Sequence, residues 1–377
     1  MIHLSRKTAA WASVAALAAG GCTAGIVIAT QGGGSGGHRA SAASKPHPVK
    51  PVPLRLVSVS PGDGDHAVDG ARSITVTYNQ PPPASAPLPV LSPAIAGTWQ
   101  RTGDAAIFIP RTGYPASTHV TVTVSGLGGI RTSIGSGTQQ STFKTGAYST
   151  LRLQQILAEL GYLPMTWTPG AGAAVPAGSA AAQLAAAYAP PPGTFTWHQG
   201  YPSALHSFWD QGKANTLDRG AITGFEADHV LPTDGVAGPT VWKALLAAAA
   251  KNQRNTHGYS YAIARQHVPQ RLTIWHDGHV VFSSPANLGI SVDPTPVGTF
   301  PVYEKLQFQV MQGTNPHGSH YADPVSWVSY FSGGSAVHYI SRGSYGFPQS
   351  LGCVELPYAA AKEAYPYLPY GTLVTVT

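Results

Sequence analysis

The chain has 377 residues, 43% of them hydrophobic, so it can fold into two to three domains of roughly 100–200 residues each and is not a disordered chain. Only 10% of the residues are charged, the formal net charge is +6, and no run of Lys or Arg indicates nucleic-acid binding. The 43 glycines and 33 prolines are typical of short strands joined by turns and linkers.

The first 30 residues have the features of an export segment. Arg6 and Lys7 precede a charge-free run, residues 8–30, which approaches the ~20 residues needed to span a bilayer. Cys22 in this run could be a lipidation site, but the small residues before it form a poor lipobox. We therefore expect residues 1–30 to be an uncleaved membrane anchor, less readily a lipoprotein signal, with the remainder of the chain outside the cytoplasmic membrane.

Residues 31–53 are rich in Gly, Ser, Ala and Pro and lack any apolar period, which predicts a flexible linker. Residues 54–146 then alternate apolar and polar positions in short runs bounded by turn residues. Period-two alternation at this spacing predicts an immunoglobulin-like β-sandwich. Because these residues contain no cluster of titratable groups, we expect a spacer or docking module there rather than a catalytic one.

The pattern of residues 149–250 predicts a helical domain. A first helix follows Ser149 and ends at Gly161, with apolar residues at helical spacing: Leu153, Ile156, Leu157 and Leu160. Pro239 is well placed to open a later helix. The runs LQQILAELGY and DGVAGPTVWKAL resemble the two ends of a small three-helix peptidoglycan-binding domain, split here by an insertion. Glycan binding is what this resemblance implies, whereas most aromatic residues of the insertion are expected to pack.

Residues 258–377 return to a β-rich pattern. Asp277-Gly278 lies between two apolar runs and predicts a tight hairpin. A short helix is predicted at 357–365 and a terminal strand at 372–377. The chain is therefore expected to be a mixed multidomain protein: a β-sandwich, a small helical domain and a β-rich C-terminal domain.

Cys353 is the only cysteine outside the N-terminal segment, so it has no partner for a disulfide within the exported part of the chain. His338 precedes it across a loop rich in Gly and Ser, and an imidazole can activate a thiol and later return the proton. The backbone N–H groups of Gly352 and Cys353 could face a developing oxyanion. The pattern favours a cysteine-nucleophile acyl-transfer site over the alternative of a small buried hydrophobe.

Three motifs in order, PTPVGTF at 294–300, His338, and SLGCV at 350–354, resemble the catalytic domain of the L,D-transpeptidases (YkuD-type) over residues 258–377. The predicted anchor and sandwich are similar to those of family members that carry immunoglobulin-like spacers. The resemblance implies that the chain is an enzyme that cross-links peptidoglycan stem peptides and needs no metal or organic cofactor. It also implies carbapenem β-lactams as inhibitors.

The resemblance gives each site residue a role. Cys353 is the expected nucleophile, His338 the general base, the Tyr339 backbone carbonyl the group that orients the imidazole, and the Gly352 N–H an oxyanion donor. The thiolate is expected to attack the carbonyl of the third stem residue, expel the terminal D-Ala, and yield its acyl group to an amine of a second stem. Candidate substrate-binding residues are Tyr321, Trp327, Tyr330, Phe331 and Ser350. For Ser350 the alternative is that its hydroxyl has a structural role near the cysteine.

Three positions depart from the family pattern. Tyr339 stands where the family often has Gly, Leu351 replaces the second histidine of SHGC, and Glu355 replaces a common Arg or Asn. Zinc sites at 276–279 and 317–320 are weak hypotheses, because neither pair of histidines has a third ligand at convincing spacing.

Two alternatives to a transpeptidase stay open. An L,D-carboxypeptidase would use the same site with water as acceptor. A non-catalytic wall-binding scaffold would act through residues 149–250. All three hypotheses share stem peptides or glycan as partners, with a membrane contact through the N-terminal segment.

Overall fold

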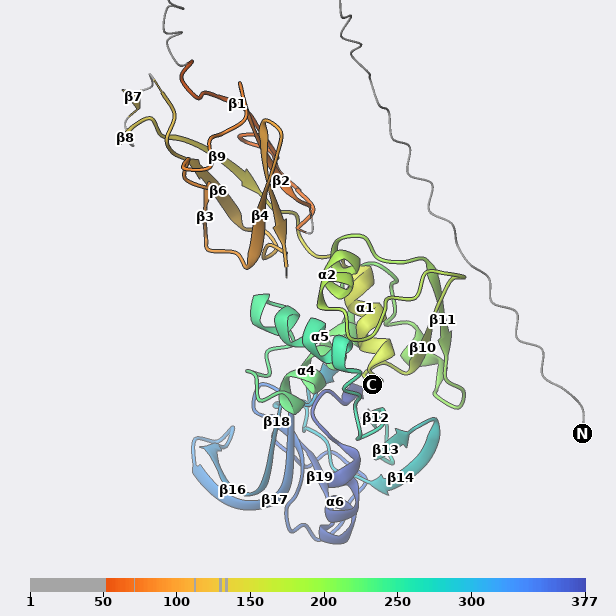
Figure 1. The fold of residues 1–377 in the computed structure, drawn as a ribbon. Coiled ribbons are helices and arrows are strands. Elements are labelled where there is room, and N and C mark those ends of the chain that lie inside the picture. The colour runs from red at the N-terminus through yellow and green to blue at the C-terminus, as the bar shows by residue number, and fades with distance from the viewer. Residues whose placement is uncertain (1–51, 71, 112, 129–130, 133–134) are drawn as a thin grey trace, which may run out of the picture. The chain divides into compact units, whose positions relative to one another are not determined.

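The computed structural model describes residues 52–70, 72–111, 113–128, 131–132 and 135–377 (Figure 1). Val52–Thr377 form one compact unit. The predicted anchor at 1–30 and nearly all of the predicted linker at 31–53 therefore lie outside the described residues. Within the described part of the chain, no helix is long and apolar enough to cross a bilayer.

Two antiparallel sheets share one core in the first part of this unit. Their strand orders are β1-β2-β5-β4 and β3-β6-β9. The strands are β1 (Leu56–Ser60), β2 (Ile74–Tyr78), β3 (Val90–Ser92), β4 (Gly97–Thr102), β5 (Ala105–Pro110), β6 (His119–Val124) and β9 (Gln139–Lys144), with a small separate pair, β7 (Arg131–Thr132) and β8 (Gly135–Ser136). Alternation along β2 buries Ile74, Val76 and Tyr78 against the second sheet. The two sheets therefore form two layers around one core. That this β-sandwich is immunoglobulin-like stays a prediction.

Helices dominate the next part, but its insertion adds a hairpin that the sequence pattern did not predict. The elements are α1 (Thr150–Glu159), β10 (Met165–Pro169), α2 (Ala180–Tyr188), β11 (Gly193–Trp197), α3 (Ser203–His206), α4 (Thr216–Asp228) and α5 (Pro239–Lys251). Beyond α1, Gly161 has φ +81°, and α5 has Pro239 in its first turn. Both ends agree with the predicted helix boundaries.

The aromatic residues of the insertion pack into this part's core, as expected. Trp167 is buried, and Phe195 and Trp197 are partly buried against the same cluster. That cluster continues onto Tyr261 and Leu373, which lie on strands of the C-terminal part. The helical part therefore packs directly against the strands β12 (Ser260–Arg265) and β20 (Leu373–Val376) of the C-terminal part.

The C-terminal part has two sheets, of order β14-β13-β12-β20-β15 and β16-β17-β18-β19. Its elements are β12 (Ser260–Arg265), β13 (Arg271–His276), β14 (His279–Pro285), β15 (Gly298–Pro301), β16 (Glu304–Thr314), β17 (His320–Ser332), β18 (Ser335–Tyr339), β19 (Val354–Leu356), α6 (Tyr358–Ala364), a 3-10 turn η1 (Tyr365–Tyr367) and β20 (Leu373–Val376). Asp277 and Gly278 both have positive φ, which is the hairpin turn that the Asp-Gly pair predicts.

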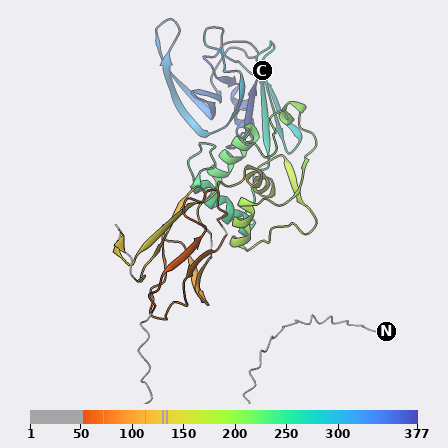
Figure 2. The ribbon, with the colours of Figure 1, turned by 90° about the horizontal axis from the view of Figure 1, so that it is seen from above.

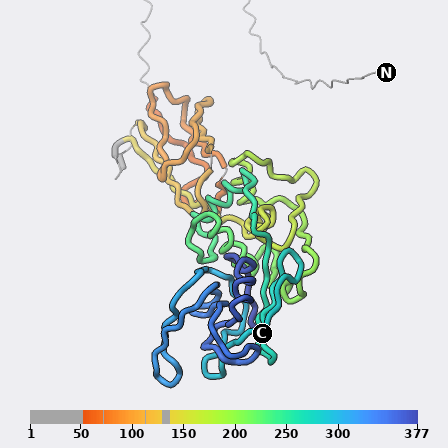
Figure 3. Tube along the Cα trace, turned by 90° about the horizontal axis from the view of Figure 1, so that it is seen from below, coloured from red at the N-terminus to blue at the C-terminus, as the bar shows by residue number. Residues whose placement is uncertain are grey.

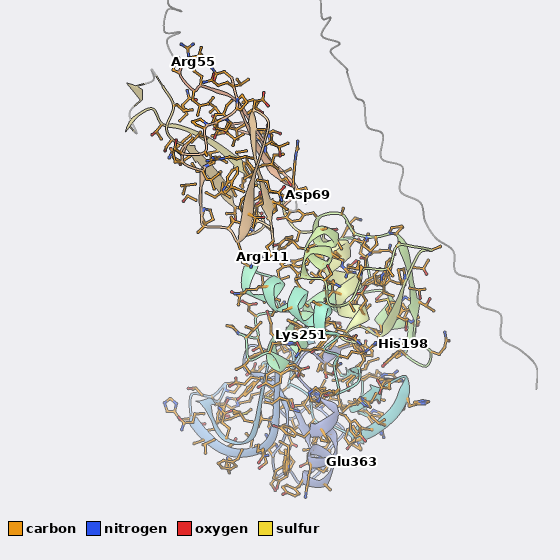
Figure 4. The ribbon with its side chains drawn as sticks, viewed as in Figure 1. Arg55, Asp69, Arg111, His198, Lys251 and Glu363 are labelled. Carbon is orange, nitrogen blue, oxygen red and sulfur yellow. The ribbon has the colours of Figure 1, made fainter. Side chains whose placement is uncertain are left out.

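β16 and β17 form a long hairpin that projects from the rest of the C-terminal part (Figures 2 and 3). Phe308 and Val310 on β16 are exposed. The base of β17 pairs with β18, the strand that ends at Tyr339. Figure 4 adds the described side chains and labels Glu363, an exposed carboxylate on α6.

Candidate active site

The two strands that carry the predicted base and nucleophile are parallel neighbours. In the β18–β19 ladder, Val337 is opposite Val354 and His338 is opposite Glu355. Cys353 immediately precedes β19, so the same register brings it beside Ala336. Partners in a ladder share a face, so His338 and Glu355 lie on the same side, and strand alternation would continue that side to Cys353, two residues before Glu355.

His338 is 2% exposed and its imidazole is held by its neighbour in the chain. The ring Nδ1 lies 3.1 Å from the Tyr339 carbonyl oxygen, the partner that the family resemblance implies. A carbonyl oxygen can only accept a hydrogen bond, so this contact places the proton on Nδ1 and leaves Nε2 as the acceptor. Burial lowers the pKa of His338 to about 4, although the Tyr339 carbonyl opposes that shift, and the imidazole is therefore neutral near pH 7.

Cys353 is also buried, at 9% exposure, and it is the free cysteine of the described residues. Its Sγ donates to the Gly334 carbonyl at 3.8 Å. The pKa of the Cys353 thiol is raised to about 11, chiefly by burial; a backbone hydrogen bond at Ala336 opposes this shift, and the carboxylates of Glu355 and Asp293 contribute to it. The resting site therefore holds a neutral thiol and a neutral imidazole.

Two hydroxyl groups fix the backbone of Cys353. Ser350 Oγ donates to the Cys353 carbonyl oxygen at 2.6 Å, and Thr295 Oγ1 donates to the same oxygen at 3.1 Å. Thr295 Oγ1 also accepts from the Gly289 N–H at 2.8 Å, so it connects the nucleophile to the segment before β15. Gly352 has φ +92°, a backbone conformation that a side chain would strain.

The predicted substrate-binding residues divide into two groups. Burial, followed by the charge of a Cys353 thiolate, raises the pKa of both Tyr321 and Tyr330, so both phenols lie within electrostatic reach of the thiol. Phe331 is instead 2% exposed and packs in the core near Phe300, with ring centroids 6.2 Å apart. Its side chain is not accessible to a ligand, because successive residues of a strand point to opposite faces.

Ser350 and Trp327 also have structural surroundings. Ser350 is fully buried, and its hydroxyl donates to the Cys353 carbonyl. This is the structural role that the sequence analysis gave as the alternative to a substrate contact. Trp327 lies against Tyr365 on η1, with ring centroids 5.6 Å apart, and is partly buried against the core of the C-terminal part.

Three residues that sequence reasoning left without a role take part in the site. Thr295 is part of the PTPVGTF motif at 294–300, and its place in that motif was the available signal. Asn287 is fully buried and bonds the loop before Cys353. Arg342 binds Glu355 through two hydrogen bonds of 2.9 and 2.6 Å. The signal for this pair was that Arg342 is the only charged residue between His338 and Glu355.

Two cavities among residues 52–377 lie away from this chemistry. One of about 410 Å³ is lined by residues that include Asp228, His257 and Lys305. A larger groove of about 1610 Å³ follows helices α1, α4 and α5. Neither includes Cys353 or His338. The assignment of the site therefore depends on geometry and chemistry, not on cavity size.

Comparison with known proteins identifies the C-terminal part. The family model of the L,D-transpeptidase catalytic domain (YkuD) matches residues 261–376. Comparison with curated proteins finds no match. Among solved structures, an L,D-transpeptidase from Mycobacterium smegmatis is 17% identical and covers 86% of this chain and 100% of its own, at a TM-score of 0.29.

Two further structures are similar at the same low score. L,D-transpeptidase 3 from Mycobacterium tuberculosis, in complex with a faropenem-derived adduct, is 16% identical over 85% of this chain and 97% of its own, at a TM-score of 0.29. The catalytic domain of the E. faecium L,D-transpeptidase is 25% identical over 33% of this chain and 100% of its own, at a TM-score of 0.29. The identification therefore depends on the family match: residues 261–376, which contain His338 and Cys353, are a YkuD-type L,D-transpeptidase catalytic domain.

Proposed function

We propose that the chain is a peptidoglycan L,D-transpeptidase that forms a thioester on Cys353. One observation supports this above the others: the β18–β19 ladder places His338 opposite Glu355, two residues after Cys353, within the residues that match the family. Because the Tyr339 carbonyl occupies Nδ1, His338 has Nε2 available to take a proton.

In the acylation step, Cys353 Sγ bonds to the carbonyl carbon of the third stem residue while its proton passes to His338 Nε2. The backbone N–H groups of Gly352 and Cys353 stabilise the oxyanion that forms. The C–N bond to the terminal D-Ala then breaks, and the imidazolium gives its proton to the departing amine. Since burial keeps the thiol and the imidazole neutral at rest, the proton transfer takes place when a substrate carbonyl is present.

In the second step, a side-chain amine of another stem attacks the thioester. His338 takes the proton of the attacking amine, the C–S bond breaks, and the thiolate regains a proton from the imidazolium. The products are an amide cross-link and the free thiol. The two steps balance in atoms and electrons without an oxidant or a reductant.

The other parts of the chain are proposed to bring this domain to the cell wall. Residues 1–30 would anchor it in the cytoplasmic membrane, residues 54–146 would act as a spacer outside the cell, and residues 149–250 would contact glycan. Tyr321 and Tyr330 would contact the donor stem, since both lie within electrostatic reach of Cys353. Carbapenems are proposed inhibitors because their strained carbonyl is an acyl donor to the same thiol.

The test compares the full chain with Cys353→Ala and His338→Gln. A tetrapeptide stem or a carbapenem should add its acyl group to Cys353 in the wild-type chain, as mapped by peptide mass spectrometry. His338→Gln should keep the thiol and lose most of the adduct, and Cys353→Ala should form none. Full cross-linking of purified stems by Cys353→Ala would refute the proposal.

The two alternatives have their own outcomes in this assay. Tripeptide released in equal amounts with and without an amine acceptor, and no cross-linked product, would indicate an L,D-carboxypeptidase. No acyl adduct from either donor, together with sacculus binding that disappears when residues 149–250 are deleted, would indicate a scaffold.

A further inference from the structure

The connection between the predicted base and nucleophile controls how they meet. His338 lies near the end of β18 and Cys353 just before β19, and residues 340–352 join them. Only three residue pairs form the ladder between these two strands. With so short a ladder, contacts that fix the connection also fix the position of the thiol against the imidazole.

The second half of the connection is held by Asn287, which is fully buried. Its Nδ2 donates to the Ser344 carbonyl at 3.0 Å and to Gln349 Oε1 at 2.7 Å, and its Oδ1 accepts from the Gly346 N–H at 2.9 Å. The backbone of Asn287 also exchanges two hydrogen bonds of 2.9 Å with Glu355. This half of the connection is therefore tied to the start of β19.

The first half is held by an ion pair. Arg342 Nε donates to Glu355 Oε2 at 2.9 Å, and Arg342 Nη2 donates to Glu355 Oε1 at 2.6 Å. The Glu355 side chain is 4% exposed and that of Arg342 is 28% exposed. A two-pronged pair of this kind fixes orientation as well as distance, because the planar guanidinium matches the carboxylate.

The same pair lies beside both reacting groups. Glu355 is opposite His338 in the β18–β19 ladder and two residues after Cys353 on the same face. The family resemblance implies a common Arg or Asn at this position, where the chain has Glu355.

We propose that Glu355 is a positioning residue, which holds Arg342 and thereby fixes the connection that sets Cys353 against His338. It acts through Arg342 and does not touch the substrate. The inference rests on the proposed function only in taking Cys353 as the nucleophile. It gives Glu355 a role in the site.

The charges of Arg342 and Glu355 affect the pKa values of the reacting groups, which a purely steric role of the pair would not change. After burial, Arg342 lowers the pKa of His338, and the Glu355 carboxylate raises the pKa of Cys353. The other charged groups that act on this pair of reacting groups are Asp293, from the segment before β15, and Asp323, from β17. Tyr321 and Tyr330, also on β17, have phenol pKa values raised mainly by burial and then by a Cys353 thiolate, so both are neutral near pH 7.

The experiment compares Glu355→Gln with Arg342→Gln, and uses Glu363→Gln on the surface of α6 as the matched control. The rate of Cys353 alkylation by iodoacetamide is followed against pH by peptide mass spectrometry, and acylation by a carbapenem is timed separately. Glu355→Gln leaves a free guanidinium and should lower the alkylation midpoint by about half a pH unit or more. Arg342→Gln leaves a free carboxylate and should raise the midpoint.

Both substitutions should slow acylation roughly tenfold or more, because the connection is no longer fixed, whereas Glu363→Gln should behave as wild type. Midpoints that do not move in opposite directions, or acylation within twofold of wild type in both variants, would overturn the proposal. If Glu355→Gln does not fold, Glu355→Asp keeps the charge and shortens the reach. It should then slow acylation at an unchanged midpoint, and acylation at the wild-type rate would overturn the proposal.

Iodoacetamide needs no stem recognition, so this result is independent of the transpeptidase assay. A wild-type chain that reacts with iodoacetamide but accepts no acyl group from a stem peptide would refute the proposed function. Opposite shifts of the alkylation midpoint would still be measurable in that case.

Discussion

Replacing Thr295 with Val tests whether a side-chain hydroxyl holds the nucleophile in place. Thr295 is 1% exposed, accepts from the Gly289 N–H at 2.8 Å and donates to the Cys353 carbonyl at 3.1 Å. Val keeps the branched shape but replaces the hydroxyl with a methyl group. The substitution therefore removes two hydrogen bonds while the surrounding packing is nearly unchanged.

The expected cost follows from which group loses its partner. In Thr295→Val the buried Gly289 N–H has no acceptor left, which costs about 1–3 kcal/mol. The Cys353 carbonyl keeps its hydrogen bond from Ser350 at 2.6 Å. In the matched variant Ser350→Ala, the carbonyl keeps Thr295 and no donor is orphaned, so the expected cost is about 1 kcal/mol.

Hydrogen exchange measures this cost locally, which is necessary because a chain of several parts does not unfold in one transition. The amide of Gly289 should exchange roughly 5- to 150-fold faster in Thr295→Val than in wild type. Ser350→Ala should change that amide much less, and carbapenem acylation should slow in both variants. Unchanged protection of Gly289 in Thr295→Val, or a larger effect in Ser350→Ala, would show that the hydroxyl does not hold this segment.

Four further substitutions have outcomes that the structure specifies. Gly352→Ala should cost about 1–2 kcal/mol through its backbone, because φ is +92° while the nearest side-chain atom to a new Cβ is 3.5 Å away, and faster local hydrogen exchange checks it. Burial lowers the pKa of His338 from 6.5 to about 4, so the stability from the neutral imidazole is present above pH 6.5 and is lost as the pH falls toward 4. Hydrogen exchange of the β18 amides, corrected for the intrinsic effect of pH, should therefore show a smaller loss of protection in His338→Asn than in wild type over this range. Phe331→Ala should cost about 3–4 kcal/mol as a core truncation. Tyr321→Phe should stay within about 0.5 kcal/mol and change KM for the donor stem, and equal destabilisation of the two would contradict their placement.

The sequence predicted best those features whose cause is local. The alternation of β2, the Asp277-Gly278 turn and the Pro239 helix start each depend on a few neighbouring residues, and the structure contains all three. His338 and Cys353 could be selected because few residue types perform acyl transfer. The β10–β11 hairpin was not predicted, since its stability comes from packing against helices distant in the chain.

The division between Tyr330 and Phe331 shows why the substrate-facing residues were harder to predict. Adjacent residues of a strand point to opposite faces, so one of the two had to enter the core if the other faces the thiol. The aromatic pattern does not determine which. The choice is made by the register of β17 with β18, which shifts between Tyr330 and Ser332. Register depends on a neighbouring strand and cannot be derived from one run of residues.

The Arg342–Glu355 pair extends the same reasoning to electrostatics. Considered alone, Glu355 is an unexpected anion beside a thiol that must become a thiolate, and Arg342 is an isolated cation in a loop. Either charge without the other would be costly at these exposures, since a buried ion needs a partner. The structure joins them by two hydrogen bonds, so the departure from the family pattern at Glu355 is one half of a compensated pair. Its effect on catalysis can therefore be judged only when Arg342 is changed in parallel.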